Sequence, residues 1–173
     1  MPRQKSVLRM ILQPLGVAIV LAVLVRSTVR LYAIPSGSMQ PTLSVGDHII
    51  VIPYGPAGPA RGDVVVFRSP QRPSEWMVKR VVAAPGDLID SRLGRLRIGG
   101  YTVPEPYVRR QASTESVSPQ LVGANRYYVL GDDRDNSLDS RHWGSLPRQL
   151  IVGRARLVLW SNGSGRRIFK WIE

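Results

Sequence analysis

The chain of 173 residues is long enough for one domain and a short additional segment. It contains no cysteine, which excludes disulfide bonds and thiolate metal sites, and its 16 glycines and 14 prolines favour a loop-rich β protein. The net charge of +12 fits an anionic membrane surface or nucleic acid as a partner. Nucleic acid is the weaker choice, because the arginines are scattered and form no basic recognition helix.

A hydrophobic segment follows a basic start at residues 1–12. A helix over 13–32 would be about 28 Å long, close to the hydrocarbon thickness of a bilayer, so this segment is predicted to span a membrane once. The positive charges before this segment predict that the N-terminus lies in the cytoplasm and that the chain after Tyr32 lies on the other side of the membrane. The alternative is a signal peptide cleaved after Ala33, but Arg26 and Arg30 are unusual so close to a cleavage site.

The remaining residues, 33–173, are predicted to form a mainly β domain. Short apolar or alternating runs bounded by Gly, Pro and Asp are typical of strands. Such runs occupy 45–53, 61–67, 76–84, 127–130 and 151–160. Between them, 90–107 is predicted to contain a small hairpin, and 108–125 an exposed and irregular excursion.

The segment from Ile34 to Leu43 has the composition of a nucleophile turn. Ser36 and Ser38 flank Gly37, and a proline on each side prevents a long helix. The glycine lets backbone amides approach a bound group closely, so the segment suits an activated hydroxyl beside an anion-stabilising pocket. The alternative is a polar turn that joins an anchor to a domain.

Lys79 is the candidate base, because it interrupts an apolar strand in a protein that otherwise uses arginine. Only three of the 24 basic residues are lysines. A buried lysine can lose its proton near neutral pH, whereas an arginine cannot. The alternative is that Lys79 and Arg80 are an exposed pair on an edge strand.

The acidic loop over 131–144 allows two interpretations. In the first, a divalent cation is bound by three aspartates, Asp132, Asp133 and Asp135. The loop lacks the ligand spacing of a calcium-binding loop, which weakens this interpretation. In the second, the aspartates pair with arginines and backbone amides in a rigid polar cluster that holds Ser137, the arginines being Arg80, Arg134 and Arg141.

The two histidines raise the possibility of a serine–histidine–aspartate triad. His48 follows Asp47 directly, but adjacent strand residues point to opposite faces, which weakens this pairing. His142 stands between an arginine and a tryptophan and favours ordinary packing. The residues therefore disfavour a histidine triad.

Four blocks in this order resemble the type I signal peptidases, the membrane-bound serine–lysine proteases that remove signal peptides from exported proteins. The blocks are Pro35–Leu43, Arg61–Phe67, Val78–Asp87 and Gly131–Gly144. The similarity extends from the N-terminal hydrophobic segment to about Trp160, nearly the whole chain.

The resemblance implies a role for each catalytic residue. Ser38 matches the nucleophile, and Lys79 matches the general base. Ser36 matches the hydroxyl that forms the oxyanion hole with the Ser38 backbone amide, and Ser137 matches the serine that orients the lysine.

The resemblance also implies structural and substrate-binding residues. Two structural ion pairs are expected near the site, namely Asp132 with Arg80 and Asp139 with Arg141. The substrate is expected to lie extended between two strands, with small residues before the cut, against Ile34, Pro35, Met77 and Val78. Asp133 stands where the family usually has asparagine. Because a carboxylate facing Lys79 would favour the protonated amine, Asp133 is expected to point away.

The implied protein is a signal-peptidase-like β-barrel or folded-sheet domain over 33–173, with a small excursion at about 90–126, behind a transmembrane helix at 13–32. It needs no cofactor and no metal, and its expected partners are precursor proteins and anionic lipid. Its expected place is a bacterial cytoplasmic membrane, with the mitochondrial inner membrane as the alternative. A self-cleaving repressor-like protein and a non-catalytic module that binds extended peptides are the competing functions.

Overall fold

The structure is a computed structural model that describes residues 9–20, 29–108, 116–162 and 167–172. The chain divides into two units, Met1–Arg30 and Leu31–Glu173. In the first unit residues 9–20 are helical and their apolar side chains are exposed. In the described part of the chain, no helix is both long and apolar enough to cross a membrane.

The prediction of a helix that runs to Tyr32 is wrong at its end. Residues 21–28 lie outside the described part of the chain, and Arg30–Ala33 form strand β1. Tyr32 packs against the core cluster that contains Met39 and Leu43. Two residues later, Ile34 donates its backbone N–H to the Asp47 carbonyl at 2.8 Å. Pairing with the domain therefore overrides the local hydrophobic pattern.

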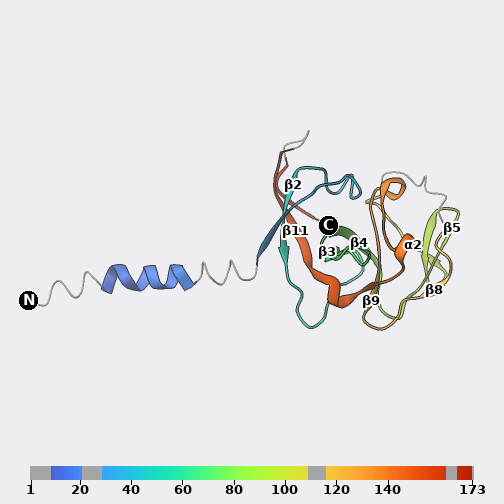
Figure 1. The fold of residues 1–173 in the computed structure, drawn as a ribbon, viewed down its shortest axis with the longest axis horizontal. Helices are drawn as coiled ribbons and strands as arrows, with labels where there is room; N and C mark the ends of the chain where they lie inside the picture. Colours follow the sequence, from blue (N-terminus) through green and yellow to red (C-terminus); the bar gives the residue numbers. More distant parts are fainter. Residues whose placement is uncertain (1–8, 21–28, 109–115, 163–166, 173) are drawn as a thin grey trace, which may run out of the picture. The chain divides into compact units, whose positions relative to one another are not determined.

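The second unit, here called the β domain, is built almost entirely from short strands (Figure 1). The strands after β1 are β2 Asp47–Ile52, β3 Val64–Arg68, β4 Trp76–Ala83, β5 Leu88–Arg92, β6 Arg95–Ile98, β7 Tyr101–Thr102, β8 Gln120–Leu121, β9 Arg126–Leu130, β10 Leu146–Pro147, β11 Ile151–Ser161 and β12 Ile168–Trp171. Among the described residues of this unit, the helical pieces are one short helix and two 3₁₀ turns: α2 Ser140–Trp143, η1 Arg134–Asn136 and η2 Arg148–Leu150.

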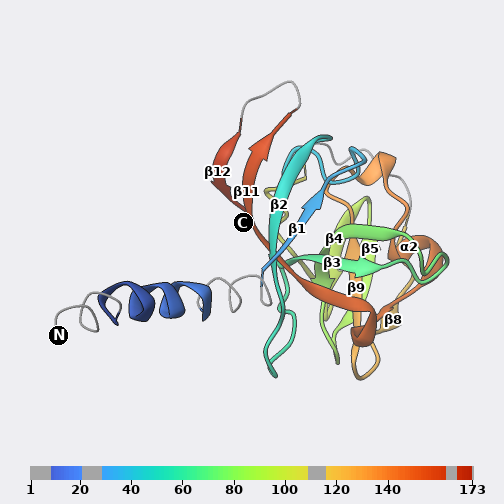
Figure 2. The same ribbon diagram turned by 60° about the vertical axis from the view of Figure 1, so that its left-hand side comes forward.

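Two sheets make up the β domain. The larger sheet has the order β1-β2-β11-β3-β4-β9-β10, with β12 also paired to β11, and the smaller has the order β7-β6-β5-β8. β11 is the longest strand and pairs with β2, β3 and β12 along its length. Figure 2 shows the β11–β12 hairpin beside β2, at the opposite side of the domain from α2 and β8. β11 thus joins β1 and β2 to the rest of the large sheet.

The mainly β prediction is confirmed, and the five predicted strands correspond to β2, β3, β4, β9 and β11. The hairpin predicted within 90–107 is also present, as β5 to β7. The excursion is less exposed than predicted, because Val117 and Val122 pack into a core cluster at 5% and 2% exposure. Residues 109–115 of the excursion lie outside the described part of the chain.

The core fixes the positions of the two segments that carry the candidate catalytic residues. Met39 and Leu43 are buried in the same cluster as residues of β2, β3 and β11, so the turn after Ile34 is fastened to the large sheet. β4 pairs with β3 from Trp76 to Arg80, and β9 joins its other edge only from Arg80 onward. The first half of β4 therefore keeps one edge that no described strand occupies.

Gly153 is a position where the sheet has no room for a side chain. A Cβ there would lie 2.5 Å from the backbone oxygen of Ile52 in β2. We expect Gly153→Ala to lower the free energy of unfolding by about 1–3 kcal/mol, because β2 and β11 would have to separate. Gly123→Ala is the control, since its nearest neighbour, an Arg126 carbon, lies at 3.6 Å. Equal urea midpoints for the two variants would contradict this packing.

Candidate active site

Ser38 lies in a compact turn whose residues Met39 and Leu43 are packed into the core. The turn is closed by backbone hydrogen bonds from Gln40 to Gly37 at 2.9 Å and from Leu43 to Met39 at 2.8 Å. Ser38 itself is 8% exposed, and the buried side chain of Met39 follows it directly. Anchoring by Met39 thus places the Ser38 hydroxyl at the edge of the core.

Lys79 meets this hydroxyl from β4. Its Nζ atom lies 2.6 Å from Ser38 Oγ, and the lysine is 3% exposed. The structure therefore brings the two predicted catalytic residues together across 41 positions of sequence. It also excludes the alternative of an exposed Lys79–Arg80 pair, since Arg80 is 1% exposed.

Burial determines the protonation of the Lys79 amine. Removal from water lowers the pKa of Lys79 to about 8, because the charged ammonium loses its hydration. Asp139 and Asp132 raise this pKa in part, and Arg141 lowers it. With a pKa of about 8, about a tenth of Lys79 is neutral at pH 7 and able to accept a proton from Ser38.

Ser36 lies beside the pair. Its Oγ atom is 3.3 Å from Ser38 Oγ, and its residue is exposed toward solvent. A hydroxyl in this position can donate a hydrogen bond to an oxygen that develops negative charge next to Ser38.

A buried ion pair fixes the residue after Lys79. Arg80 Nε and Nη2 donate to the two Asp132 oxygens at 2.9 and 2.8 Å, and both side chains are almost fully buried. The Thr42 hydroxyl donates to Asp132 Oδ2 at 2.5 Å, and the Arg80 guanidinium stacks on the Tyr107 ring at 4.0 Å. This pair, predicted from the resemblance, therefore ties the serine turn to the lysine strand.

Asp139 is the centre of a second polar cluster. Its carboxylate accepts hydrogen bonds from Arg141 Nε at 2.8 Å, Gly131 N at 3.0 Å and Ser137 Oγ at 2.7 Å. Burial alone would raise the pKa of Asp139, but these bonds, led by Arg141, hold it below its ordinary value. The predicted Asp139–Arg141 pair is thus present, and Asp139 stays charged.

Ser137 lies close to the Ser38 backbone, but its hydrogen bond is to Asp139. Gly131 separates the two serines so tightly that a Cβ on Gly131 would lie 2.5 Å from the Ser38 carbonyl oxygen and 2.2 Å from Ser137 Oγ. The direct bond from Ser137 to Lys79 stays a prediction.

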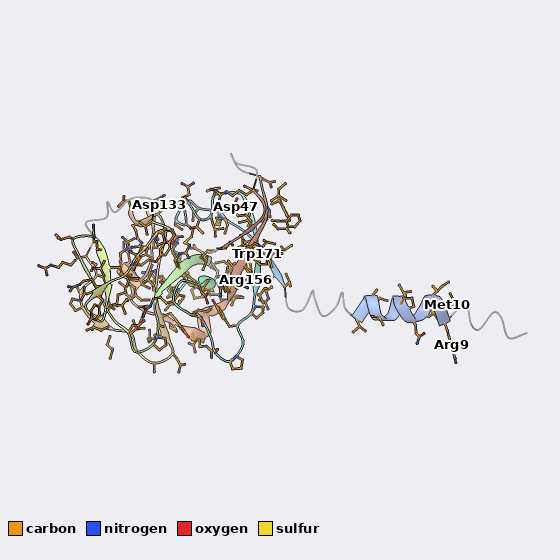
Figure 3. The ribbon with its side chains drawn as sticks, turned by 180° about the vertical axis from the view of Figure 1, so that it is seen from behind. Arg9, Met10, Asp47, Asp133, Arg156 and Trp171 are labelled. Carbon is orange, nitrogen blue, oxygen red and sulfur yellow. The ribbon has the colours of Figure 1, made fainter. Side chains whose placement is uncertain are left out.

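The neighbouring acidic residue, Asp133, touches the catalytic turn through its backbone. Its N–H donates to the Ser38 carbonyl at 3.1 Å. The charges that act on the Lys79 amine are Asp139, Asp132 and Arg141. Figure 3 labels Asp133 near the upper edge of the β domain in this view, and the direction of its carboxylate stays a prediction.

The structure also bears on the predicted partner of Arg134, on the two histidines and on the proposed cation site. Arg134 pairs with Glu105 and not with an aspartate, which corrects one predicted partner in the acidic loop. His48 stacks on Trp160 with 4.3 Å between ring centroids, and His142 takes part in the capping box of α2. Among the described residues, no three His, Asp or Glu side chains are grouped as metal ligands.

The four predicted substrate-binding residues lie on both sides of the pair. Ile34 and Pro35 follow β1, and Met77 and Val78 belong to β4. Ile34 is 3% exposed, so its side chain belongs to the core, while Pro35 is exposed. Sequence reasoning missed Thr42, Tyr107 and Gly131. Thr42 and Gly131 lie inside recognised blocks, but the contact of Tyr107 with Arg80 depends on long-range packing.

Comparisons with known proteins identify the family to which the chain belongs. The sequence model of the family described as signal peptidase, peptidase S26, matches residues 6–160. A signal peptidase I of Leptolyngbya laminosa is 39% identical over 92% of this chain and 83% of its own. The thylakoidal processing peptidase 1 of Arabidopsis thaliana is 34% identical over 83% of this chain and 46% of its own.

Two further comparisons concern one bacterial sequence and one solved structure. A signal peptidase I of Pseudomonas aeruginosa is 35% identical over 75% of this chain and 64% of its own. A crystal structure of a signal peptidase I from Enterococcus faecalis covers 56% of this chain and 95% of its own, with a TM-score of 0.49 and 28% identity. Since the family model and the first relative both span most of the sequence, the chain belongs to the signal peptidase family, peptidase S26, whose members are hydrolases that cleave signal peptides.

Proposed function

We propose that the protein is a membrane-anchored serine endopeptidase that removes signal peptides with Ser38 as nucleophile and Lys79 as general base. The observation that carries the proposal is the 2.6 Å contact between Lys79 Nζ and Ser38 Oγ in a buried site. A hydroxyl is a poor nucleophile until a nearby base takes its proton, and a serine–lysine pair is one established solution.

The proposed reaction needs only groups of this chain and water. Neutral Lys79 accepts the Ser38 proton while Ser38 Oγ bonds to the scissile carbonyl carbon. The resulting ammonium then donates the proton to the leaving amine as the peptide C–N bond breaks, which leaves an acyl-enzyme. Lys79, neutral again, takes a proton from water as the hydroxide adds to the acyl carbonyl carbon. The ester C–O bond then breaks, Lys79 returns the proton to Ser38 Oγ, and the signal peptide is released with a new C-terminal carboxyl group.

The tetrahedral intermediate needs hydrogen-bond donors for its oxyanion. We assign this role to the Ser36 hydroxyl and the Ser38 backbone N–H, and the 3.3 Å distance between the two serine oxygens supports it. Loss of one such donor costs about 2.7–4 kcal/mol of transition-state stabilisation in a comparable site.

The open edge of β4 supports an extended substrate. The backbone N–H and C=O of Val81 bond to Asp63 and Gly62, on the β3 side, so by the alternation of a strand those of Val78 face the opposite, open edge. The backbone N–H and C=O of Ile34 bond to Asp47 and Gly46. Because backbone groups alternate in direction along an extended chain, those of Ala33 and the Pro35 carbonyl face away from β2. A peptide strand added between these edges would reach Ser38 directly.

The spacing between the two edges is consistent with a single added strand. The rings of Tyr32 in β1 and Trp76 in β4 contact each other at 5.5 Å between centroids. Strands that flank one inserted strand lie about 10 Å apart, a distance that two large side chains can bridge. We assign Pro35 and Val78 to the peptide backbone and propose that small residues precede the cut.

Lipid is the second proposed partner. The N-terminal hydrophobic segment is proposed to anchor the protein, with residues 1–12 inside and the β domain outside a bacterial cytoplasmic membrane. In the β domain, β12 exposes Ile168, Phe169 and Trp171 at 62–66%, and Figure 3 shows Trp171 on the surface. Aromatic and basic residues together suit the interface of an anionic bilayer.

Replacement of either member of the pair tests the chemistry. We expect Ser38→Ala and Lys79→Ala each to reduce cleavage of a labelled precursor by at least about 100-fold, because the nucleophile or its base is lost. Lys170→Ala is the matched control, since Lys170 lies on β12 and is exposed. A non-catalytic peptide-binding module would keep its affinity in all three variants. Cleavage by Lys79→Ala at the rate of the unmodified protein would refute the assignment.

The pH dependence follows from the depressed pKa of Lys79. Its base form is lost as pH falls through about 8, so kcat/KM should decrease about tenfold per pH unit below that value. The measurement is an initial-rate profile between about pH 5 and about pH 9, with a stability scan to exclude unfolding. A flat profile would contradict lysine as the base.

Charges placed in the hydrophobic segment test the anchor. We expect Val17→Arg with Val20→Arg to move the protein from the membrane fraction to the soluble fraction, because each charge costs about 2.5–3.5 kcal/mol at the centre of a span. Val45→Arg, at an exposed valine of the β domain, is the control. Membrane retention of the double variant, or an intact mass that lacks residues 1–33, would contradict an uncleaved anchor.

A further inference from the structure

Arg167 contacts the segment that follows the catalytic serine, although it lies beyond residue 160, where the family match ends. Its Nη1 atom donates to the Thr42 carbonyl at 3.0 Å and the Pro41 carbonyl at 3.4 Å. Its Nη2 atom donates to the Ser44 hydroxyl. One guanidinium therefore bonds to three residues between Ser38 and β2.

The same guanidinium is the cation beside a fully buried carboxylate. Asp47, the first residue of β2, has a side chain at 0% exposure, and Arg167 Nη1 lies 3.5 Å from its Oδ2. Asp47 Oδ2 also accepts the Ser44 backbone N–H at 2.8 Å, whereas Oδ1 has no hydrogen-bond partner among the described residues. Because a buried carboxylate without a counter-charge is costly, the removal of Arg167 would destabilise this corner.

The position of Arg167 is set by the C-terminal hairpin. β12 pairs with β11 at Ile168 and Trp160, and β11 in turn pairs with β2. Asn162, at the end of β11, donates its backbone N–H to the Gly46 carbonyl at 3.0 Å. Figure 2 shows β12, β11 and β2 side by side, so the hairpin reaches the serine segment from one side of the sheet.

The opposite side of the serine segment is held by Thr42. Its hydroxyl bonds to Asp132 in the ion pair with Arg80, while its carbonyl bonds to Arg167. Thr42, four positions after Ser38, is thus held by Asp132 through its side chain and by Arg167 through its backbone. An error of about 1 Å in the position of a nucleophile can cost about 100-fold in rate.

We propose that Arg167 is a positioning residue for catalysis, which holds the segment after Ser38 so that the serine hydroxyl stays in line with Lys79. This inference rests on the proposed serine–lysine mechanism. It makes the segment after residue 160 part of the active-site architecture.

The geometry of the contact requires the shape of arginine as well as its charge. The planar fork of the guanidinium presents separate N–H groups to the Pro41 and Thr42 carbonyls and to Ser44. A lysine ammonium could neutralise Asp47, but as a compact charge on a flexible stem it would not order the three acceptors together. The two roles can therefore be separated by substitution.

The test compares Arg167→Ala and Arg167→Lys in the full chain, with a fluorogenic peptide that carries alanine before the cut. We expect Arg167→Ala to lower kcat about 10–100-fold with KM within about twofold, and to lower the urea midpoint. Arg167→Lys should recover most of the midpoint, because it restores the charge beside Asp47, and should keep the low kcat. Arg156→Ala removes another arginine of the same hairpin (Figure 3) and should leave kcat and the urea midpoint unchanged.

The outcomes separate this inference from the mechanism on which it rests. A kcat for Arg167→Ala equal to that of the unmodified protein, with Ser38→Ala inactive, would overturn the positioning role alone. So would a full recovery of kcat in Arg167→Lys, because charge would then be sufficient. Normal cleavage by Ser38→Ala would instead overturn the proposed mechanism. If Arg167→Ala does not fold, Arg167→Lys still decides the question through its kcat.

Discussion

The whole site depends on the contact between a buried lysine amine and a serine hydroxyl. An ammonium at 3% exposure is unfavourable, so burial moves the pKa of Lys79 to about 8 and makes the amine a usable base. Nearby Asp139 and Asp132 limit this shift, while their arginine partners keep the region from becoming strongly acidic. The balance between desolvation and these paired charges sets the working range of the proposed enzyme.

The large sheet serves this contact by holding two chain segments that are distant in sequence. β4 carries Lys79, and the turn that carries Ser38 is fastened to the core by Met39 and Leu43. The acidic loop then bridges the two segments, because Thr42 bonds to Asp132, Asp132 pairs with Arg80 of β4, and the Asp133 N–H bonds to the Ser38 carbonyl. The same arrangement leaves the first half of β4 open, which is where an extended substrate is proposed to bind.

Local patterns were sufficient to predict the strands and to single out Lys79, because β-branched runs and a lysine in an apolar strand are visible in the sequence. The pairing of Lys79 with Ser38 rested on the resemblance of whole sequence blocks. Local patterns failed where tertiary contacts decide. The apolar run predicted helix to Tyr32, but pairing with β2 makes Arg30–Ala33 a strand. Arg134 was assigned an aspartate partner, whereas folding of the excursion brings Glu105 to it. The role of Arg167 has no local signal, since its partners lie more than 100 residues earlier.

The most direct measurement is the titration of the Lys79 amine by NMR in the full protein labelled at the lysine side-chain carbons. The chain has only three lysines, so Lys79 can be assigned by comparison with Lys79→Arg and Lys170→Arg variants. The proposed mechanism predicts a midpoint at about 8 for Lys79. A midpoint near the ordinary lysine value of about 10.4 would contradict the claim that burial prepares this amine as the base.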